Sequence, residues 1–451
     1  MFFRRDALTE RLYNEVHIHS DHPMLLKNLN GKSICILGYG REGKAMVKAL
    51  EAFAPQCAIT IADNNADLVV EGNHSKQVGE QWLQNLEKFD LIIKSPGIPP
   101  NILATSNPKL ATVTNSTQIF LEEAAAGGAK VIGVTGSKGK STTASLIYTI
   151  LKEAGQNAFL VGNIGEPAIA HIKDIKTNTI FVQEMSSYQL MDCTVSPCIA
   201  VITSFFPEHL DYHGSLENYR EAKSHVTQFQ TENDYVIYDA NSPGAEEIAK
   251  LSPGRRVAAH TEDLPLTSSD LLLKGEHNLR NAAIAFLTSR LLGVPERISI
   301  PVIQNFKGLP HRLQTLGIHH GIEWIDDAIS TTPESTIAAL DALSDRVVAI
   351  ILGGQDRGND FSALGARIAV SKIKTVILFP GSGPRIRKAI EDAKADVSFF
   401  EVETMEAAVA KAKTTNCTPP SIVLLSTASP SYGMFRNFEE KGDAFARCIM
   451  N

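Results

Sequence analysis

The chain has 451 residues, of which 43% are hydrophobic and 21% charged, and its formal net charge is −7 at pH 7. This length and composition are typical of a globular protein with roughly two to four domains. The lack of a basic surplus argues against nucleic-acid binding. No apolar run reaches about eighteen residues, so the sequence predicts no membrane-spanning helix. Six scattered cysteines and an N-terminus without an apolar signal core favour a reduced, cytoplasmic protein.

The first part of the chain alternates short apolar runs with amphipathic stretches. Residues 33–37 (SICIL) predict a strand, residues 38–43 (GYGREG) a turn and residues 44–53 a helix. Further strands are expected at 57–63 (CAITIAD) and in 90–99 (DLIIKSPGIP), which ends in a Ser-Pro-Gly turn. A GxGxxG turn with Asp63 about twenty residues later is typical of a phosphate and ribose site, and alone it would favour a dehydrogenase.

The second part opens with a strand at 130–136 and continues as a helix at 140–155. The sequence GSKGKST (136–142) covers the turn between them and the start of the helix. Its glycines allow backbone N–H groups to face an anion, and the helix N-terminus adds partial positive charge. Lys140 is expected to reach the β- and γ-phosphates of a nucleotide, and Ser141 to bind Mg²⁺. The first glycine of the common Walker A pattern is replaced by Val134, so this is a variant of that loop.

Polar residues follow further expected strands at 178–185 and 198–205. Glu184 and His209 are the kinds of group that hold Mg²⁺ next to ATP, although a hydrogen-bonded structural histidine is the competing interpretation of His209. Lys223 lies in YREAKSH. Asn278 and Asn281 are able to hydrogen-bond a base, but asparagines also cap helices.

The third part predicts strands at 321–328, 346–354, 374–381 and 421–428, and a final amphipathic helix within 435–450. Strand–helix alternation predicts parallel, doubly wound sheets that bind ligands at the carboxyl ends of their strands. We therefore expect an α/β protein of three domains. They are a Rossmann-like N-terminal domain (1–117), a central P-loop ATPase-like domain (118–309) and a Rossmann-like C-terminal domain (310–451).

Eight motifs, in one order along nearly the whole chain, resemble those of the Mur ligase family. They are TGSKGKST, GNIG (162–165), EMSSYQL, EHLDYH, YREAK, GEHNLRNA, GLPHR and IDDA. A series of spaced motifs is far more specific than any one of them. Together with the short length, GYGREG and SPGIP look like the branch that adds glutamate to UDP-N-acetylmuramoyl-L-alanine. Other Mur ligases and folylpolyglutamate synthase are less similar.

The resemblance implies a monomeric, ADP-forming ligase of peptidoglycan precursor synthesis, with ATP, UDP-N-acetylmuramoyl-L-alanine and glutamate as its ligands and two Mg²⁺ sites. Lys140, His209 and Lys223 would be catalytic. The UDP-sugar would be held by Gly38, Tyr39, Gly40, Arg41, Asp63, Asn64, Ser95, Gly97 and Asn163. ATP would be held by Gly136, Ser137, Lys138, Gly139, Lys140, Ser141, Thr142, Asn278, Asn281, Arg312 and Asp327. The metal ligands would be Ser141, Glu184, His209 and, if carbamylated, Lys223.

The resemblance also places the incoming amino acid in the third domain, where this sequence departs from the D-glutamate branch. Its residues there would be Thr331, Arg357, Ser431, Tyr432 and Phe438. Ile329 and Arg357 stand where that branch has lysines, and an Arg holds a carboxylate in a planar fork rather than as a point charge. These changes look like the branch that adds L-glutamate, which we expect over D-glutamate. A nucleotide switch without ligase activity and a non-catalytic binding protein are the alternatives from other classes.

Overall fold

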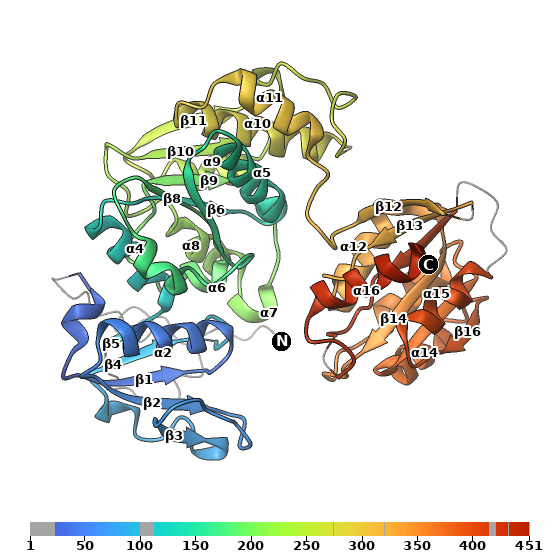
Figure 1. The fold of residues 1–451 in the computed structure, drawn as a ribbon, viewed down its shortest axis with the longest axis horizontal. Coiled ribbons are helices and arrows are strands. Elements are labelled where there is room, and N and C mark those ends of the chain that lie inside the picture. Colours follow the sequence, from blue (N-terminus) through green and yellow to red (C-terminus); the bar gives the residue numbers. More distant parts are fainter. Residues whose placement is uncertain are drawn as a thin grey trace, which may run out of the picture. The chain divides into compact units, whose positions relative to one another are not determined.

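The computed structural model describes residues 23–99, 112–273, 275–319, 321–414, 421–431 and 433–450. Three β-sheets with flanking helices make up this part of the chain (Figure 1). The chain divides into two compact units, the first ending at Phe306 and the second beginning at Lys307. The first two sheets belong to the first unit and the third sheet to the second. The expected α/β class is confirmed, whereas the limits of the three expected domains stay a prediction.

The first sheet has five parallel strands in the order β3-β2-β1-β4-β5. Its strands are β1 (Ser33–Leu37), β2 (Ala58–Asp63), β3 (Ser75–Val78), β4 (Leu91–Lys94) and β5 (Thr112–Thr114). Helix α2 (Arg41–Phe53) follows β1, and α4 (Ser116–Ala126) leads into the second sheet. The apolar run of β1 is almost entirely buried, as expected for a central strand covered on both faces.

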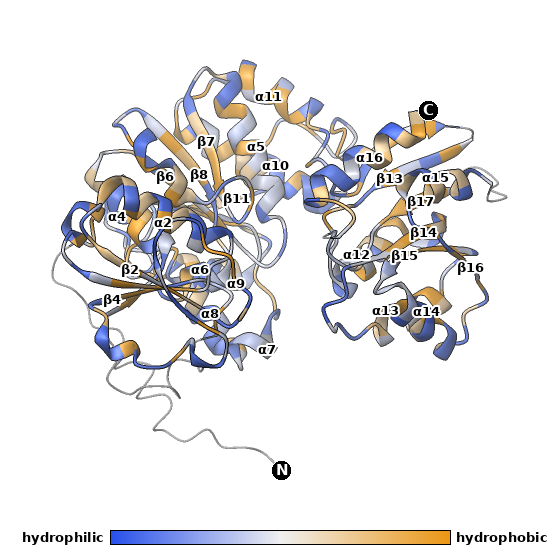
Figure 2. Ribbon diagram, turned by 60° about the horizontal axis from the view of Figure 1, so that its bottom comes forward, coloured by the Kyte–Doolittle hydropathy of each residue, from blue (hydrophilic) through white to orange (hydrophobic). Residues whose placement is uncertain are grey.

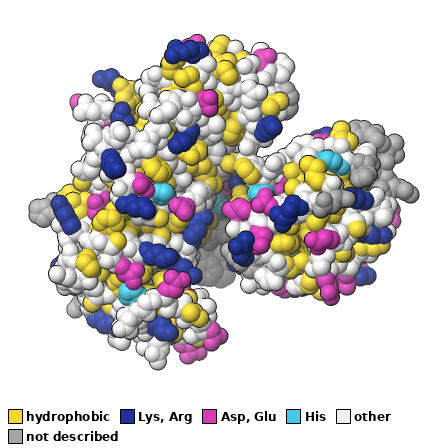
Figure 3. Space-filling model, viewed as in Figure 1, with side chains coloured by type: hydrophobic (Ala, Val, Ile, Leu, Met, Phe, Trp, Pro, Cys, Tyr) yellow, Lys and Arg dark blue, Asp and Glu magenta, His cyan; other side chains and the backbone are white. Residues whose placement is uncertain are grey.

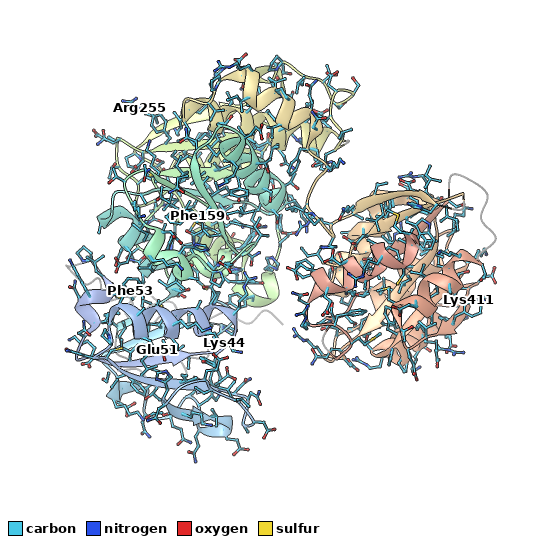
Figure 4. The ribbon with its side chains drawn as sticks, viewed as in Figure 1. Lys44, Glu51, Phe53, Phe159, Arg255 and Lys411 are labelled. Carbon is cyan, nitrogen blue, oxygen red and sulfur yellow. The ribbon has the colours of Figure 1, made fainter. Side chains whose placement is uncertain are left out.

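The second sheet has six parallel strands in the order β11-β10-β9-β6-β8-β7. They are β6 (Lys130–Thr135), β7 (Asn157–Gly162), β8 (Thr179–Glu184), β9 (Ile199–Ile202), β10 (Tyr235–Asp239) and β11 (Arg255–Ala259). The helices are α5 (Lys140–Glu153), α6 (Ser187–Leu190), α7 (Leu210–His213), α8 (Leu216–Ser224), α9 (Pro243–Ala249), α10 (Glu276–Leu291) and α11 (Glu296–Asn305). Helices α5 and α10 share one apolar core with this sheet. Phe159 of β7, labelled in Figure 4, stacks on Phe181 in a separate core.

The third sheet has the order β12-β13-β17-β14-β15-β16. Its strands are β12 (Gln314–His319), β13 (Ile322–Asp326), β14 (Val347–Gly354), β15 (Thr375–Gly381), β16 (Ser398–Glu401) and β17 (Ile422–Leu425). The helices are α12 (Pro333–Leu343), α13 (Ser362–Ala369), α14 (Gly383–Asp392), α15 (Met405–Lys413) and α16 (Phe438–Met450). The expectation of purely parallel sheets is wrong here, because β12 pairs antiparallel with β13. Since β12 is a partly exposed edge strand, it lacks the apolar run that identified the other strands.

The interior and surface follow the hydropathy of the sequence. The apolar colour in Figure 2 gathers on strands such as β14, whose residues are nearly all buried. Figure 3 shows Lys and Arg side chains interspersed with Asp and Glu side chains over the visible face. None of the helices in the described ranges combines the length and the apolar character that crossing a bilayer requires.

A buried ion pair joins the first sheet to the second within the first unit. Lys94, at the end of β4, lies 2.8 Å from the Asp192 carboxylate, and the two side chains are 1% and 4% exposed. The Lys94 ammonium also donates to the carbonyl of Ile98 at 3.1 Å. A charge pair removed from water this completely is tolerated only while both partners are present.

Lys94→Ala should lower the free energy of unfolding by about 3–5 kcal/mol, because the Asp192 carboxylate is then buried without its cation. Urea denaturation of the full chain measures this change. Lys48→Ala removes an exposed lysine of α2 and should change the same quantity by less than about 0.5 kcal/mol. A Lys94→Ala variant as stable as the natural protein would show that the pair does not hold the two sheets together.

Candidate active site

The loop between β6 and α5 has a backbone that only glycine adopts readily at two positions. Gly136 has φ +148° and Gly139 φ +88°. A Cβ on Gly136 would collide with the Thr203 hydroxyl, and one on Gly139 would lie 2.5 Å from Oδ1 of Asn281. The loop is therefore packed closely against the chain that follows β9 and against α10. Asn281 Nδ2 in turn donates to Oδ1 of Asn278 at 3.3 Å, which brings both asparagines to this loop.

Hydrogen bonds from the segment after β9 hold the same loop. The Ser137 N–H donates to the carbonyl of Ser204 at 2.9 Å, and the Lys138 N–H donates to the Ser204 hydroxyl at 2.9 Å. The Ser137 hydroxyl donates to the carbonyl of Phe206 at 2.8 Å. The first N–H groups of α5, which begins at Lys140, have no acceptor within their own helix and are the groups suited to an anion.

Two lysines converge on one carbonyl of this loop. The Lys140 ammonium donates to the carbonyls of Gly136 and Ser137 at 2.9 and 3.0 Å. The Lys223 ammonium donates to the same Gly136 carbonyl at 2.9 Å, although its side chain is only 2% exposed. Burial, reinforced by the nearby Lys140, holds the pKa of Lys223 well below its usual value. Lys140, the first N–H groups of α5 and a lysine that a nearby anion would help to protonate make this a site that favours a bound polyanion.

A buried carboxylate lies at the end of the neighbouring strand β8. Glu184 is 1% exposed, and its Oε1 accepts from Asn163 Nδ2 at 2.9 Å. Its Oε2 is buried without a hydrogen-bond partner among the described residues. Such an oxygen fits a bound cation. The described ranges contain no group of three or more His, Cys, Asp or Glu side chains able to hold a metal. The partnerless carboxylate oxygen of Glu184 fits Mg²⁺, which takes most of its ligands from water and phosphate.

Residues 208–213 contact both the loop between β6 and α5 (the expected phosphate-binding loop, 136–140) and the turn that follows β4 of the first sheet. Glu208 pairs with Lys138 at 2.6 Å, and the exposed His209 has φ +54° and a ring centre 5.2 Å from that of Tyr188. At the other end, the Tyr212 hydroxyl lies 2.8 and 3.1 Å from the carbonyls of Pro96 and Ile98. Sequence reasoning missed Tyr212, because no motif signals a hydrogen bond to a backbone carbonyl.

The turn after β1 is held by a carboxylate of its own sheet. Both oxygens of Asp63 accept backbone N–H groups, from Tyr39 at 2.8 Å and from Asn65 at 2.9 Å. The Ser95 hydroxyl donates to the carbonyl of Gly38 at 2.8 Å. Lys44, labelled in Figure 4, has its ammonium 5.6 Å from the centre of the Tyr39 ring. Asp63 and Ser95 thus order the turn itself, while Asn64 and Gly97 are exposed.

Arg41 and Glu42 connect this turn to the second sheet. Arg41 Nη2 donates to the carbonyls of Gly162 and Asn163, at 2.8 and 3.3 Å. The Glu42 carboxylate accepts from the Ser116 hydroxyl at 2.7 Å and from Gln189 Nε2 at 3.2 Å. Since Asn163 holds Glu184, a continuous series of polar contacts runs from the turn after β1 to the buried carboxylate.

The second unit contains its own buried polar group after β13. Asp327 accepts from the Ser426 hydroxyl at 2.7 Å and from the Leu313 N–H at 3.2 Å, and burial raises its pKa to about 6. Asp326 lies 2.7 Å from Nδ1 of the buried His311. Arg312, the other residue expected near the nucleotide in this unit, is exposed.

The residues expected to contact the amino acid are in the second unit. Ser431 is buried, and its hydroxyl has no hydrogen-bond partner among the described residues. Arg357 is exposed, whereas Thr331 is half-buried. The Phe438 ring centre lies 6.2 Å from that of His311. Tyr432 lies outside the described residues.

The expected site residues thus form separate groups. The first unit brings together the loop 136–142, Asn163, Glu184, Lys223, Asn278 and Asn281, with the turn 38–41 connected through Arg41. The first unit also contains Asp63, Asn64, Ser95, Gly97 and His209. The second unit contains Arg312, Asp327, Thr331, Arg357, Ser431 and Phe438.

Comparisons with known proteins match both units. A family model described as the Mur ligase middle domain matches residues 134–265, and one described as the Mur ligase, glutamate ligase domain matches residues 311–428. The chain is 34% identical to UDP-N-acetylmuramoyl-L-alanine--L-glutamate ligase of Salinispora tropica, over 94% of this chain and 99% of that protein. It is 31% identical to UDP-N-acetylmuramoylalanine--D-glutamate ligase of Streptococcus mutans, over 93% of this chain and 97% of that protein.

Solved structures share the fold at low sequence identity. MurF from Acinetobacter baumannii has a TM-score of 0.56 at 14% identity, covering 98% of each chain. MurF ligase from Thermotoga maritima in complex with ADP has a TM-score of 0.51 at 17% identity, covering 96% of this chain and 99% of that one.

Lys223→Met should raise the free energy of unfolding by about 0.5–2 kcal/mol, because it removes a buried cation that Lys140 repels. Burial depresses the pKa of Lys223 in the folded protein, so the folded state disfavours a proton that the unfolded chain holds below pH 10.5. The gain should therefore be present at pH 7 and disappear as the pH rises toward 10.5.

Thermal and urea denaturation of the nucleotide-free protein, at pH 7 and near pH 10.5, measure this gain in the free energy of unfolding. The matched control is Lys250→Met, which removes an exposed lysine at the end of α9 and should change stability by less than about 0.5 kcal/mol. Loss of stability in Lys223→Met at pH 7 would contradict the inference that burial next to Lys140 makes a protonated Lys223 unfavourable.

Proposed function

The chain belongs to the Mur ligase family, whose members are ADP-forming ligases, and we propose that it joins glutamate to UDP-N-acetylmuramoyl-L-alanine at the expense of ATP. The observation that carries the proposal is the loop on which Lys140 and Lys223 share the Gly136 carbonyl, next to the buried Glu184 carboxylate. This arrangement supports binding of a nucleotide triphosphate and a cation. The names of full-length relatives at 30–34% identity support the glutamate and the sugar nucleotide.

ATP is proposed to bind with its phosphates against the start of α5. The Lys140 ammonium is close enough to the loop carbonyls to turn toward a phosphate with little movement of its backbone. Asn281, against Gly139, and the adjacent Asn278 are proposed to contact the nucleotide. Arg312 and Asp327 are also proposed to contact the phosphate and ribose of ATP, on the basis of the family resemblance alone.

Mg²⁺ is proposed at two positions, one held by Glu184, His209 and the Ser141 hydroxyl and a second held by Lys223. When bound, the metal would supply positive charge that offsets the negative charge of the phosphates. Lys223 would have to be carbamylated to act as a ligand, because only then does it carry a carboxylate. Its burial and depressed pKa favour the neutral amine that such a reaction requires.

The reaction is proposed in two steps. The substrate carboxylate attacks the γ-phosphorus of ATP, forming a new P–O bond as the bond to ADP breaks, while Lys140 neutralises charge on the transferred group. The neutral amine of glutamate then attacks the acyl carbon, phosphate leaves, and a base takes the amine proton. His209 is proposed as that base, as the alternative to its role as a metal ligand. The UDP-sugar is proposed to lie against the turn 38–41, Ser95, Gly97 and Asn163.

The enantiomer is proposed to be L-glutamate. Relatives of both kinds are similarly distant, at 34% and 31% identity, so the names alone leave the choice open. The half-buried Ile329 and the exposed Arg357 support L-glutamate, since both replace lysines of the D-glutamate branch. Arg and Lys orient a carboxylate differently, which is how a changed amino-acid site would select the other enantiomer.

Phosphate release is expected with UDP-N-acetylmuramoyl-L-alanine, ATP, Mg²⁺ and L-glutamate, and at least about tenfold more slowly with D-glutamate, because a binding difference of about 1.4 kcal/mol is tenfold. A coupled phosphate assay, with mass spectrometry of the product, measures both rates. Reactions without the sugar nucleotide are the control. Faster turnover of D-glutamate would assign the chain to the other branch, and turnover of neither would remove the proposed function.

Glu184→Gln should lower kcat by about 10²-fold or more and raise the Mg²⁺ concentration for half-maximal rate, because an amide replaces the charged ligand. Titrating Mg²⁺ at saturating substrates measures both effects. The matched control is Gln183→Leu, which changes the adjacent buried residue whose side-chain polar atoms have no partner among the described residues. An unchanged Mg²⁺ requirement in Glu184→Gln would place the metal elsewhere.

A further inference from the structure

Lys441 of α16 is a buried lysine to which the proposed reaction assigns no role. Its side chain belongs to a residue that is 1% exposed, and its ammonium donates to the Thr427 hydroxyl. Burial lowers its pKa to about 7, even though the carboxylates of Asp326 and Asp327 raise it. Burying this lysine near the carboxyl end of the sheet costs free energy. Packing of α16 does not explain it, because Ala444, Phe445 and Ile449 already pack the helix against the core.

The contact with Lys441 determines which way the Thr427 hydroxyl points. An ammonium only donates, so Thr427 Oγ1 accepts from it and is left with its own hydrogen to donate. Its acceptors are the carbonyl of Ser429, at 2.9 Å from Oγ1, and the more distant carbonyl of Ser330, at 3.4 Å. Through Thr427, Lys441 thereby connects the turn after β17 with the segment after β13. The strands β13 and β17 are parallel and direct neighbours in the sheet.

The turn after β17 is strained and needs such support. Ala428 has φ +54°, a left-handed conformation that a residue with a Cβ adopts only where its surroundings enforce it. Thr427 is anchored by Lys441 on one side of Ala428, and the Ser429 hydroxyl lies 2.7 Å from that of Ser382 on the other. This strained turn leads directly to Ser431, whose buried hydroxyl has no partner among the described residues.

The charges around Lys441 are relevant to a ligand that carries carboxylates. Asp326 and Asp327 lie at and just after the end of β13, and the pKa of Asp327 is raised to about 6 by burial. His311 contacts Asp326 at 2.7 Å, which leaves Lys441 as the buried lysine that both carboxylates act on. Ile329, in the segment between Asp327 and Thr331, supplies no charge. The pKa of His311 is raised by its hydrogen bond to Asp326, so His311 and Lys441 are two buried groups able to offset the repulsion between these aspartates and an approaching carboxylate.

We propose that Lys441 is a positioning residue for the amino-acid substrate, which holds the turn 427–431 in the shape that presents Ser431 to a carboxylate of glutamate. It acts through Thr427 and does not touch the substrate itself. Its charge offsets Asp326 and Asp327, in a chain whose Ile329 provides no cation. The inference rests on the proposed function, because it assumes that the amino acid binds to the second unit.

A purely structural role predicts a different result from a positioning role. If Lys441 only fastened α16 to the sheet, its removal would lower stability and affect the apparent affinities for all three substrates alike. If it positions the turn, its removal raises KM for glutamate and leaves KM for ATP and for the sugar nucleotide nearly unchanged. Loss of a hydrogen bond to a charged group corresponds to about 10- to 100-fold in affinity.

The experiment compares Lys441→Met and Thr427→Val, which break the same contact from opposite sides, with Thr427→Ser, which keeps the hydroxyl. We expect KM for L-glutamate to rise about 10- to 100-fold in Lys441→Met and in Thr427→Val, and by less than about twofold in Thr427→Ser. The double variant Lys441→Met/Thr427→Val should be no worse than the more affected single variant, because both remove one interaction. Thermal denaturation of each variant accompanies the kinetics.

The outcomes separate this inference from the proposed function. If Lys441→Met does not fold, Thr427→Val, which is isosteric, carries the test. If the natural protein uses glutamate but both variants keep its KM, or raise all three KM values equally, the inference is overturned and the ligase function stands. If the natural protein uses neither enantiomer of glutamate, the proposed function fails first and the inference falls with it.

Discussion

The convergence of two lysine ammonium groups on the carbonyl of Gly136 is the interaction on which the candidate active site depends. Lys140 comes from the start of α5 and Lys223 from the end of α8, so the loop carbonyl is the point where two helices meet the end of β6. Burial and the nearby Lys140 together lower the pKa of Lys223, so a proton on Lys223 costs free energy that a bound polyanion would offset. The glycines at 136 and 139 are consequences of the same crowding, because the space that a Cβ would need is filled by Thr203 and Asn281.

The connections between the first two sheets explain how a turn in one is able to influence a carboxylate in the other. Arg41 reaches the carbonyls of Gly162 and Asn163, and the Asn163 side chain holds Glu184. Tyr212 approaches the Ser-Pro-Gly turn from a segment whose other end pairs with the phosphate-binding loop. The buried Lys94–Asp192 pair lies in the same region. The chemistry proposed for the first unit therefore rests on a scaffold of direct polar contacts between its two sheets.

Each unit stores local strain or charge at the carboxyl ends of its strands. In the first unit the stored feature is the pair of lysines, and in the second it is the left-handed Ala428 beside the buried Lys441. The two lysines are not part of the apolar cores, whereas Ala428 packs within the core of the third sheet and only its left-handed backbone is strained. Buried lysines and backbone strain of this kind cost stability and are characteristic of binding sites, where the ligand supplies the missing interactions.

The strands with continuous apolar runs and the strand, turn and helix around residues 136–140 followed from the sequence, because periodicity and glycine placement are local properties. That this turn binds phosphate stays a prediction. The antiparallel edge strand β12 did not, since a half-exposed strand has no apolar run to identify it. Motif order placed Glu184, Lys223 and Ser431 among the candidate site residues. It did not predict that one oxygen of Glu184 lacks a partner among the described residues, or that both lysines donate to the Gly136 carbonyl. No motif or periodicity in the sequence indicated the contacts of Tyr212, Lys94 and Lys441. Their partners are Pro96, Asp192 and Thr427, and only the folding of the chain brings such separated positions within hydrogen-bonding distance. The sequence by itself thus determined the family, the elements and the chemistry-bearing residue types. The tertiary structure decided which of those residues share a contact, because burial and charge pairing depend on neighbours that are distant along the chain.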